Sequence, residues 1–309
     1  MKRQSMSSTG GRETPLPFRE AAGTLPQRCV VCSSPATPYR EVRGYLYHRC
    51  THCGLQFIGP GSGGIRTADV YGDNYFFGGG AGYPNYLQEQ ALLVNHGRRY
   101  ARIVSRFASP SRLLDVGSAA GFILKGFIDA GWAGVGIEPN ATMAAYANTR
   151  LGVDVRMGTI EAYRAPELFD LITMIQVLEH VVDLDASLVS AAAATKTGGL
   201  WLIESMDGAS FLAKLFGIQW HGYSPPSVRC IFTPTALRIL ARRFGFEPLA
   251  AGHPRKWLSG AHVKSLLAYK ASDGWANRVV GIAARLLPDE LSLPYPGRDL
   301  MWSIYRKLP

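Results

Sequence analysis

Short apolar runs alternate with stretches of helical periodicity along most of the chain. Five strands are expected, at 112–116, in a run ending at 138, and at 153–158, 168–176 and 200–205. Between and after them, helical spacing predicts helices over 122–131, 140–150, 183–196, 234–244 and 274–287. Two further strands are expected, from 245 and over 300–307. This alternation predicts an α/β fold built on a doubly wound parallel sheet.

The chain before residue 109 has a different pattern. One long helix is expected over 85–107, and the aromatic stretch before it either folds over a ligand as a lid or packs against the core. The first residues are polar and glycine-rich, as in a disordered tail. The pattern divides the chain into a tail at 1–25, a small N-terminal module at 26–64, a lid segment with its connecting helix at 65–108, and an α/β domain at 109–309. Within that domain, the core spans 109–206 and the roof loop 207–233.

A glycine-rich turn follows the first strand of the α/β domain. It reads LLDVGSAAG, with Asp115 ending the strand and Gly117, Ala119 and Gly121 in the turn, while Glu138 ends the next strand 23 residues later. Strand, glycine turn, helix, strand and acid is the order of a nucleotide-type site. A carboxylate before the turn repels a phosphate and attracts an ammonium group. The residues therefore favour S-adenosylmethionine over a dinucleotide, and the remaining alternative is a turn that binds nothing.

The same residues resemble the first motif of the class I S-adenosylmethionine-dependent methyltransferases, in which Asp and an apolar residue precede Gly-x-Gly-x-Gly. Ala119 stands where the middle glycine is usual and narrows the turn by one methyl group. The resemblance is strong over 109–206 and weak over 207–309. It implies a Rossmann-like seven-stranded sheet with a reversed final hairpin. It also implies that Asp115 binds the amino-acid end of the cofactor and Glu138 its ribose hydroxyls.

Residues directly after the strands are the next candidates, since ligands lie at the carboxyl ends of parallel strands. Thr159 and Ile160 are placed to border the adenine, and Gln176 ends the fourth strand. A hydroxyl acceptor needs a base to remove its proton. His180 is the first candidate, because VLEHV resembles the corresponding segment of small-molecule methyltransferases. Its alternative role is to bond a backbone carbonyl at a helix entry.

The loop 207–233 is expected to roof the substrate. His221, in QWHGYSPP, is the second candidate base, and Tyr223 lies beside it as a third catalytic candidate. The alternative for His221 is an exposed loop residue. Methyltransferases that act on exocyclic amines of bases carry Asn/Asp-Pro-Pro-Tyr/Phe after the fourth strand. IQVLEH takes that place here, which favours a compact acceptor over a flipped base.

Two CxxC pairs occur near the N-terminus. Cys29 and Cys32 form the first pair and Cys50 and Cys53 the second, with 17 residues between them. Two such knuckles predict a closed, structural four-thiolate zinc site, so that the module is a zinc ribbon. A segment this small cannot bury enough core to fold alone, and the metal would supply its stability. The alternatives are disulfides or a redox motif.

Composition leaves the partner open between two classes. The chain of 309 residues has 47% hydrophobic and 18% charged residues, as in a globular protein, and a formal charge of +10. No apolar run of membrane-spanning length and no secretory signal are seen, so a cytoplasmic location is expected. The sequence predicts a methyltransferase that acts on oxygen or carbon of a small sugar-like or natural-product acceptor, free, nucleotide-linked or carrier-linked. The alternatives are an rRNA or tRNA methyltransferase and a degenerate binding protein; the oligomeric state is not predicted.

Overall fold

The computed structural model describes residues 27–59, 72–78, 83–165, 167–270, 287–295 and 297–309. The expected tail at 1–25 lies outside these residues. So does nearly all of the amphipathic helix expected over 274–287.

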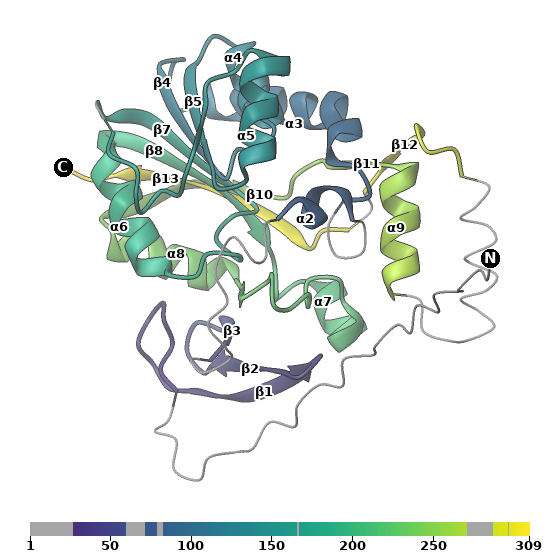
Figure 1. Cartoon of the computed structure of the whole chain (residues 1–309). Coiled ribbons are helices and arrows are strands. Elements are labelled where there is room, and N and C mark those ends of the chain that lie inside the picture. The colour runs from purple at the N-terminus through teal and green to yellow at the C-terminus, as the bar shows by residue number, and fades with distance from the viewer. Residues whose placement is uncertain (1–26, 60–71, 79–82, 166, 271–286, 296) are drawn as a thin grey trace, which may run out of the picture.

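A seven-stranded sheet forms the centre of the molecule (Figure 1). Its strand order is β10-β13-β8-β7-β4-β5-β6; β13 runs antiparallel to both of its neighbours, and the other neighbouring pairs are parallel. The strands are β4 Arg112–Val116, β5 Ala133–Glu138, β6 Val155–Met157, β7 Phe169–Ile175, β8 Thr195–Met206, β10 Phe246–Gly252 and β13 Leu300–Lys307. The doubly wound sheet with a reversed final hairpin confirms the predicted fold class.

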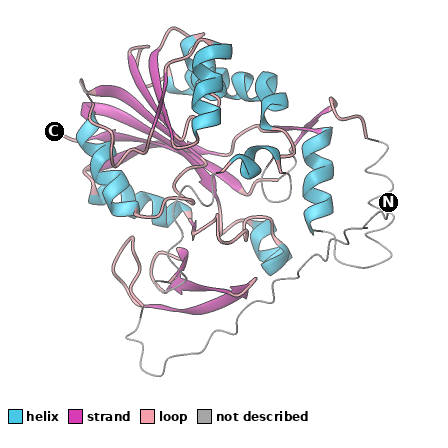
Figure 2. Cartoon of the chain, in the orientation of Figure 1, coloured by secondary structure: helices cyan, strands magenta, loops and turns pink. Residues whose placement is uncertain are grey.

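Helices cover both faces of this sheet (Figure 2). They are α3 Gln90–Val104, α4 Phe122–Ile128, α5 Ala141–Tyr146 with a continuing turn Ala147–Leu151, α6 Leu184–Ala194 and α8 Pro234–Arg243. Asn140, Asp183 and Thr233 each accept a hydrogen bond from the third amide after them, which starts α5, α6 and α8 at the expected places.

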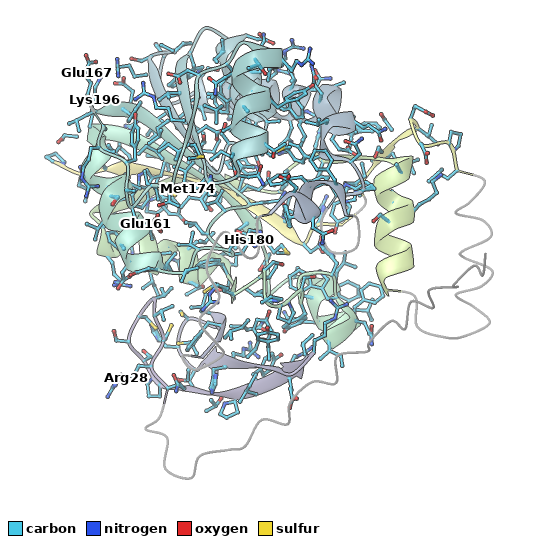
Figure 3. The ribbon with its side chains drawn as sticks, in the orientation of Figure 1. Arg28, Glu161, Glu167, Met174, His180 and Lys196 are labelled. Atoms are coloured by element: carbon cyan, nitrogen blue, oxygen red, sulfur yellow. The ribbon has the colours of Figure 1, made fainter. Side chains whose placement is uncertain are left out.

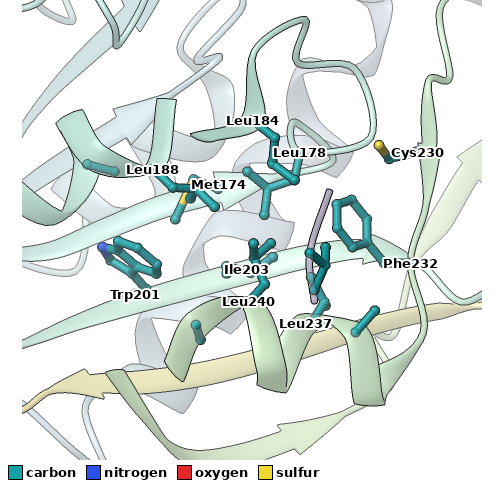
Figure 4. Close-up of a cluster of buried hydrophobic side chains, with 14 of the residues drawn as sticks. Met174, Leu178, Leu184, Leu188, Trp201, Ile203, Cys230, Phe232, Leu237 and Leu240 are labelled. Atoms are coloured by element: carbon teal, nitrogen blue, oxygen red, sulfur yellow. The ribbon is translucent and has the colours of Figure 1, made fainter. Parts of the chain in front are cut away.

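Successive residues of each strand face opposite cores. Leu200 and Leu202 of β8 pack with α3 and α4, whereas Trp201 and Ile203 pack with α6 and α8 (Figure 4). On the first of these faces α3 crosses α4 closely. A Cβ added at Gly97 would lie 2.2 Å from the carbonyl oxygen of Ile123. This contact fixes α3 beside the cavity described below.

The N-terminal module forms a second, four-stranded sheet in the order β1-β2-β3-β9. Strands β1 Ala36–Val42, β2 Tyr45–Cys50 and β3 Gln56–Ile58 belong to the module, drawn in purple in Figure 1. The fourth strand, β9 Cys230–Ile231, comes from the segment expected to be an irregular roof. That segment also contains α7 Phe211–Phe216 and the short helix Gly217–Gln219.

The remaining described elements are short helices, short strands and α9. They are α2 Asp73–Phe77, the short helix Tyr86–Glu89, β11 Trp257–Ser259, α9 Gly260–Lys270 and β12 Ser292–Pro294. Several boundaries differ from expectation, and the largest change at a strand is in β8, which begins at Thr195 instead of 200 and so includes Gly198 and Gly199. The register between β7 and β8 shifts at this point. No helix in the described part of the chain is long and apolar enough to cross a membrane.

Candidate active site

A cavity of about 180 Å³ opens at the carboxyl ends of β4, β5 and β7. Seven of the eight residues predicted to bind the cofactor line it: Asp115, Gly117, Ala119, Glu138, Thr159, Ile160 and Gln176. The eighth, Gly121, does not. It adopts a left-handed conformation at the start of α4, where a Cβ would meet the Cβ of Ala147 at 3.3 Å. Gly121 therefore allows close packing of the helix behind the cavity.

Two buried carboxyl groups face this cavity. Asp115 accepts hydrogen bonds from Ser118 Oγ at 2.8 Å and from Thr173 Oγ1 at 2.6 Å. Glu138 accepts the backbone amides of Ala119 and Asn140, both at 2.8 Å. Burial raises the pKa of Asp115 to about 6 and that of Glu138 to about 7, against these hydrogen bonds. Each carboxylate would therefore gain from a cationic or hydrogen-bond-donating ligand.

The turn between β4 and α4 approaches the ligand space with its backbone. Gly117 has a φ of 68°, and a Cβ there would lie 2.6 Å from Val177 Cγ2. Ala119 also has a positive φ, 47°, which is strained for a residue with a side chain. The turn thus keeps the shape of a glycine cradle although one glycine is missing.

Aromatic side chains from the N-terminal segment line the same cavity. Tyr75 and Phe76 come from α2, and Tyr83 and Tyr86 follow it. The ring of Tyr86 stacks on Phe122 with centroids 5.5 Å apart. The described part of the aromatic segment therefore both lines the cavity and packs into the core, so the lid stays a prediction.

A buried polar network borders the same cavity. Glu204, on β8, accepts from Gln176 Nε2 at 2.6 Å and from the hydroxyl of Tyr100, and lies 2.8 Å from His96 Nε2. Burial alone would raise the pKa of Glu204, but its contacts with His96 and Tyr100 outweigh burial and lower the pKa to about 2. Gln176 adopts a positive φ of 54°, and its backbone N–H also donates to the backbone carbonyl oxygen of Glu204. The network thus holds Gln176 in a strained conformation at the cavity wall.

A second cavity, of about 90 Å³, adjoins the first. Both cavities share five lining residues: Tyr75, Tyr83, Gln176, His180 and Lys256. The Nδ1 atom of His180 lies 2.8 Å from the carbonyl oxygen of Ser227, which can only accept, so Nδ1 carries the hydrogen and Nε2 the lone pair. Burial lowers the pKa of His180 to about 4. The ring is therefore uncharged at physiological pH.

The two other catalytic candidates occupy different places. His221 lines the second cavity, and its Nδ1 lies 3.6 Å from Oδ2 of the buried Asp299. Tyr223 is buried, donates a hydrogen bond to Gln56 of β3, and lines neither cavity. The structure thus brings His180 and His221 to one chamber and leaves Tyr223 behind its wall.

Comparison with known proteins identifies the family. A family model described as a methyltransferase domain matches residues 88–251, which are 164 of the 309 residues. The chain belongs to this methyltransferase family. The ubiquinone biosynthesis O-methyltransferases of Rhodopseudomonas palustris (strain BisB18) and Bradyrhizobium sp. (strain ORS 278) are each 33% identical over 116 residues, covering 35% of this chain and 46% of theirs. The match thus spans about half the length of these relatives.

The chain is also similar to solved structures of methyltransferases. A putative methyltransferase from Bacillus halodurans superposes with a TM-score of 0.50 at 13% identity, covering 69% of this chain and 99% of that chain. A SAM-dependent methyltransferase from Archaeoglobus fulgidus has a TM-score of 0.49 at 19% identity, covering 72% and 99%. The first of these likenesses supports the shared fold.

Outside the methyltransferase domain, the four predicted zinc ligands lie together. The Sγ atoms of Cys29, Cys32, Cys50 and Cys53 are all within 4.8 Å of one another, and all four thiols are free. A tetrahedral zinc site with Zn–S near 2.3 Å separates its sulfurs by about 3.8 Å. Backbone amides of Val31 and His52 point at Cys29 and Cys50 over 3.4 Å. Four thiolates with amide donors are a donor set that fits zinc.

Several lining residues were not predicted. His96 reaches the first cavity from α3, the helix before the motif, and Lys256, His262 and Tyr295 come from the chain after β10. The one available signal was His96, a polar residue on the core-facing side of the helix expected over 85–107. The others lie in segments whose pattern carries no recognisable motif.

Proposed function

We propose that this protein transfers the methyl group of S-adenosylmethionine to an oxygen or carbon of a small-molecule acceptor. Two observations support an oxygen: the match to relatives named as O-methyltransferases, and a neutral histidine at the junction of the two cavities. We also propose that the acceptor is sugar-like or a natural product, either free or linked to a nucleotide or carrier. A cytoplasmic location remains part of this proposal. So does structural zinc bound by the four cysteines.

The first cavity fits S-adenosylmethionine by its donor set. Asp115 offers a buried carboxylate to the ammonium group, and Glu138 offers acceptor positions to the ribose hydroxyls. A Cβ at Gly117 would clash with Val177, so the backbone can follow this path beside the ligand space only with a glycine here. Thr159 and Ile160 supply a wall for the adenine. The buried carboxyl of Asp115 beside the turn would repel a phosphate group, which disfavours a dinucleotide.

The chemistry needs alignment and one proton acceptor. The bound cofactor supplies a methyl group on a sulfonium, which is already a good leaving group. The residues of this chain have to align the acceptor and remove its proton. His180 stands in the wall of both cavities with its lone pair on Nε2, and we propose it as the base. His221, at the acceptor side alone, is the second candidate.

The observation that carries the proposal is the sharing of one wall by two adjoining cavities, one matched to the cofactor and one left for an acceptor. The first test is calorimetry with S-adenosylmethionine and S-adenosylhomocysteine. Micromolar binding of both is expected, and no binding by metal-replete protein would favour the degenerate binding protein. The second test is transfer of labelled methyl to a panel of phenols, sugars, sugar nucleotides and RNA. Label in RNA alone would overturn the small-molecule assignment.

A further inference from the structure

We propose that the zinc-ribbon module positions the catalytic histidine. In this proposal Tyr47 and Gln56 of the module hold the segment 223–231, whose Ser227 carbonyl in turn orients the imidazole of His180. The proposal rests on the function assigned above, because it takes His180 as the base. It assigns to Tyr47 and Tyr223 a positioning role, since neither contacts the cavities.

The module is joined to this segment by backbone and side chains. Strand β9 adds to the module's sheet, with Gln56 opposite Ile231 and Phe57 opposite Cys230. The amide of Ile58 donates to the carbonyl oxygen of Arg229 at 3.0 Å. The segment is therefore a strand of the module as much as a loop of the methyltransferase domain.

Two buried tyrosines reinforce the junction. Tyr47, which has no exposed surface, donates its hydroxyl to the carbonyl oxygen of Val228 at 2.6 Å. Tyr223 donates to the side-chain oxygen of Gln56. The two rings meet edge to face with centroids 5.3 Å apart. Because the buried carbonyl of Val228 depends on the Tyr47 hydroxyl, the contact strongly favours one position of the segment.

The other side of the same segment faces His180. The carbonyl oxygen of Ser227 accepts the Nδ1 hydrogen of His180 at 2.8 Å. The amides of Arg229 and Cys230 donate to the carbonyl oxygen of Glu179 at 2.7 and 3.1 Å. Ser227 thus bonds to the histidine and Val228 to the module, while Arg229 bonds both to the module and to the methyltransferase domain. In Figure 3, His180 lies between the large sheet and the module.

Further contacts tie the cysteine knuckles to the methyltransferase domain. Thr233 Oγ1 donates to the carbonyl oxygen of Cys53 at 2.7 Å. The guanidinium of Arg243, on α8, donates to the carbonyl oxygens of Val30 and Val31 at 2.7 and 3.0 Å. The module is therefore anchored at both knuckles, so that its β2–β3 edge has a fixed place behind the acceptor cavity.

The test is Tyr47→Phe in the full chain, followed by nitrogen NMR of the histidine rings. The His180 signals are assigned by difference from His180→Gln. In the wild type, Nδ1 is expected to carry the hydrogen. In Tyr47→Phe a mixture of tautomers is expected, with unchanged affinity for S-adenosylhomocysteine. Once an acceptor is known, kcat should fall by up to about 100-fold, the scale of an ångström-sized misplacement.

Tyr45→Phe is the matched control, because Tyr45 lies on the same strand and no hydrogen bond of its hydroxyl is found among the described residues. It should keep the wild-type tautomer. If Tyr47→Phe does not fold, Tyr223→Phe tests the same junction through Gln56. A folded Tyr47→Phe or Tyr223→Phe variant with the wild-type tautomer and kcat would overturn the proposal. If Tyr47→Phe loses the single tautomer of His180 while His180→Gln keeps full activity, the result would support the positioning of His180 by the module and reject His180 as the base.

Discussion

The imidazole of His180 donates its Nδ1 hydrogen to the carbonyl oxygen of Ser227 across 2.8 Å. This bond selects the tautomer with a lone pair on Nε2, while burial lowers the pKa of the ring to about 4. A base with that pKa is protonated only in acid. With S-adenosylmethionine kept saturating at each pH, we therefore expect kcat/KM for the acceptor to stay level down to about pH 5 and to fall as pH drops through 4. An acid limb near the ordinary histidine value of about 6.5 would place the base elsewhere.

Replacement separates the two candidate bases. His180→Gln keeps a polar side chain of similar size and should lower kcat by about 10²–10⁴-fold without changing cofactor affinity, since it removes only the proton acceptor. His221→Gln, in the same chamber, serves as the comparison and should retain most of the rate. Full activity of His180→Gln with loss of activity in His221→Gln would transfer the role to His221, which lies near Asp299.

Cofactor affinity should depend on the ionisation of Asp115. Burial raises the pKa of this carboxyl to about 6, so it is protonated and unable to pair with an ammonium in acid. Affinity for S-adenosylmethionine should therefore be highest above pH 7 and weaken as pH falls below 6. Asp115→Asn should weaken binding at pH 8 by about 1–3 kcal/mol and flatten this pH dependence. Calorimetry at each pH measures both effects.

The matched control for Asp115 is a smaller ligand. 5′-Methylthioadenosine keeps the adenine and ribose but has no amino-acid end. Its affinity should be the same for the wild type and Asp115→Asn. An equal loss for both ligands would mean that the substitution disturbs the turn held by Ser118 and Thr173, not a charge pair.

The glycine turn predicts opposite effects at two neighbouring positions. Gly117→Ala should lower the free energy of unfolding by about 1–3 kcal/mol, because its Cβ would meet Val177 at 2.6 Å and its φ is positive. Ala119→Gly relieves a left-handed alanine and should raise stability by up to about 1 kcal/mol. Urea unfolding of the two variants measures both signs. Destabilisation by Ala119→Gly would show that its methyl group packs better than the strain costs.

The parts of the structure that could be predicted from the sequence are those with local causes. Short apolar runs located the strands, and capping residues marked the helix starts, at Asn140 and at Asp183. Asp115 and Glu138 were found because each ends a strand, and parallel strands end at one edge of a sheet. These features follow from a few consecutive residues.

The parts that could not be predicted depend on distant partners. His96 and Glu204 meet across 108 positions, and Tyr47 and Val228 across 181. Strand β9 has only two residues, so its own sequence carries no period, and its pairing with β3 is decided by packing. Tyr223 illustrates the consequence: its place beside His221 in the sequence suggested catalysis, whereas its hydroxyl faces the ribbon.

Removal of one thiolate should test both the metal and its structural role. Cys32→Ser leaves three sulfurs, so the purified protein should lose its zinc, expected at about one atom per chain in the wild type. Loss of the metal should lower the melting temperature, because a module this small depends on the metal for its fold. Cys230→Ala is the control: this fifth cysteine lies on β9 outside the cluster and should leave the zinc content unchanged. Elemental analysis and thermal unfolding give the two readouts. Equal zinc in the wild type and Cys32→Ser would exclude the four-thiolate site.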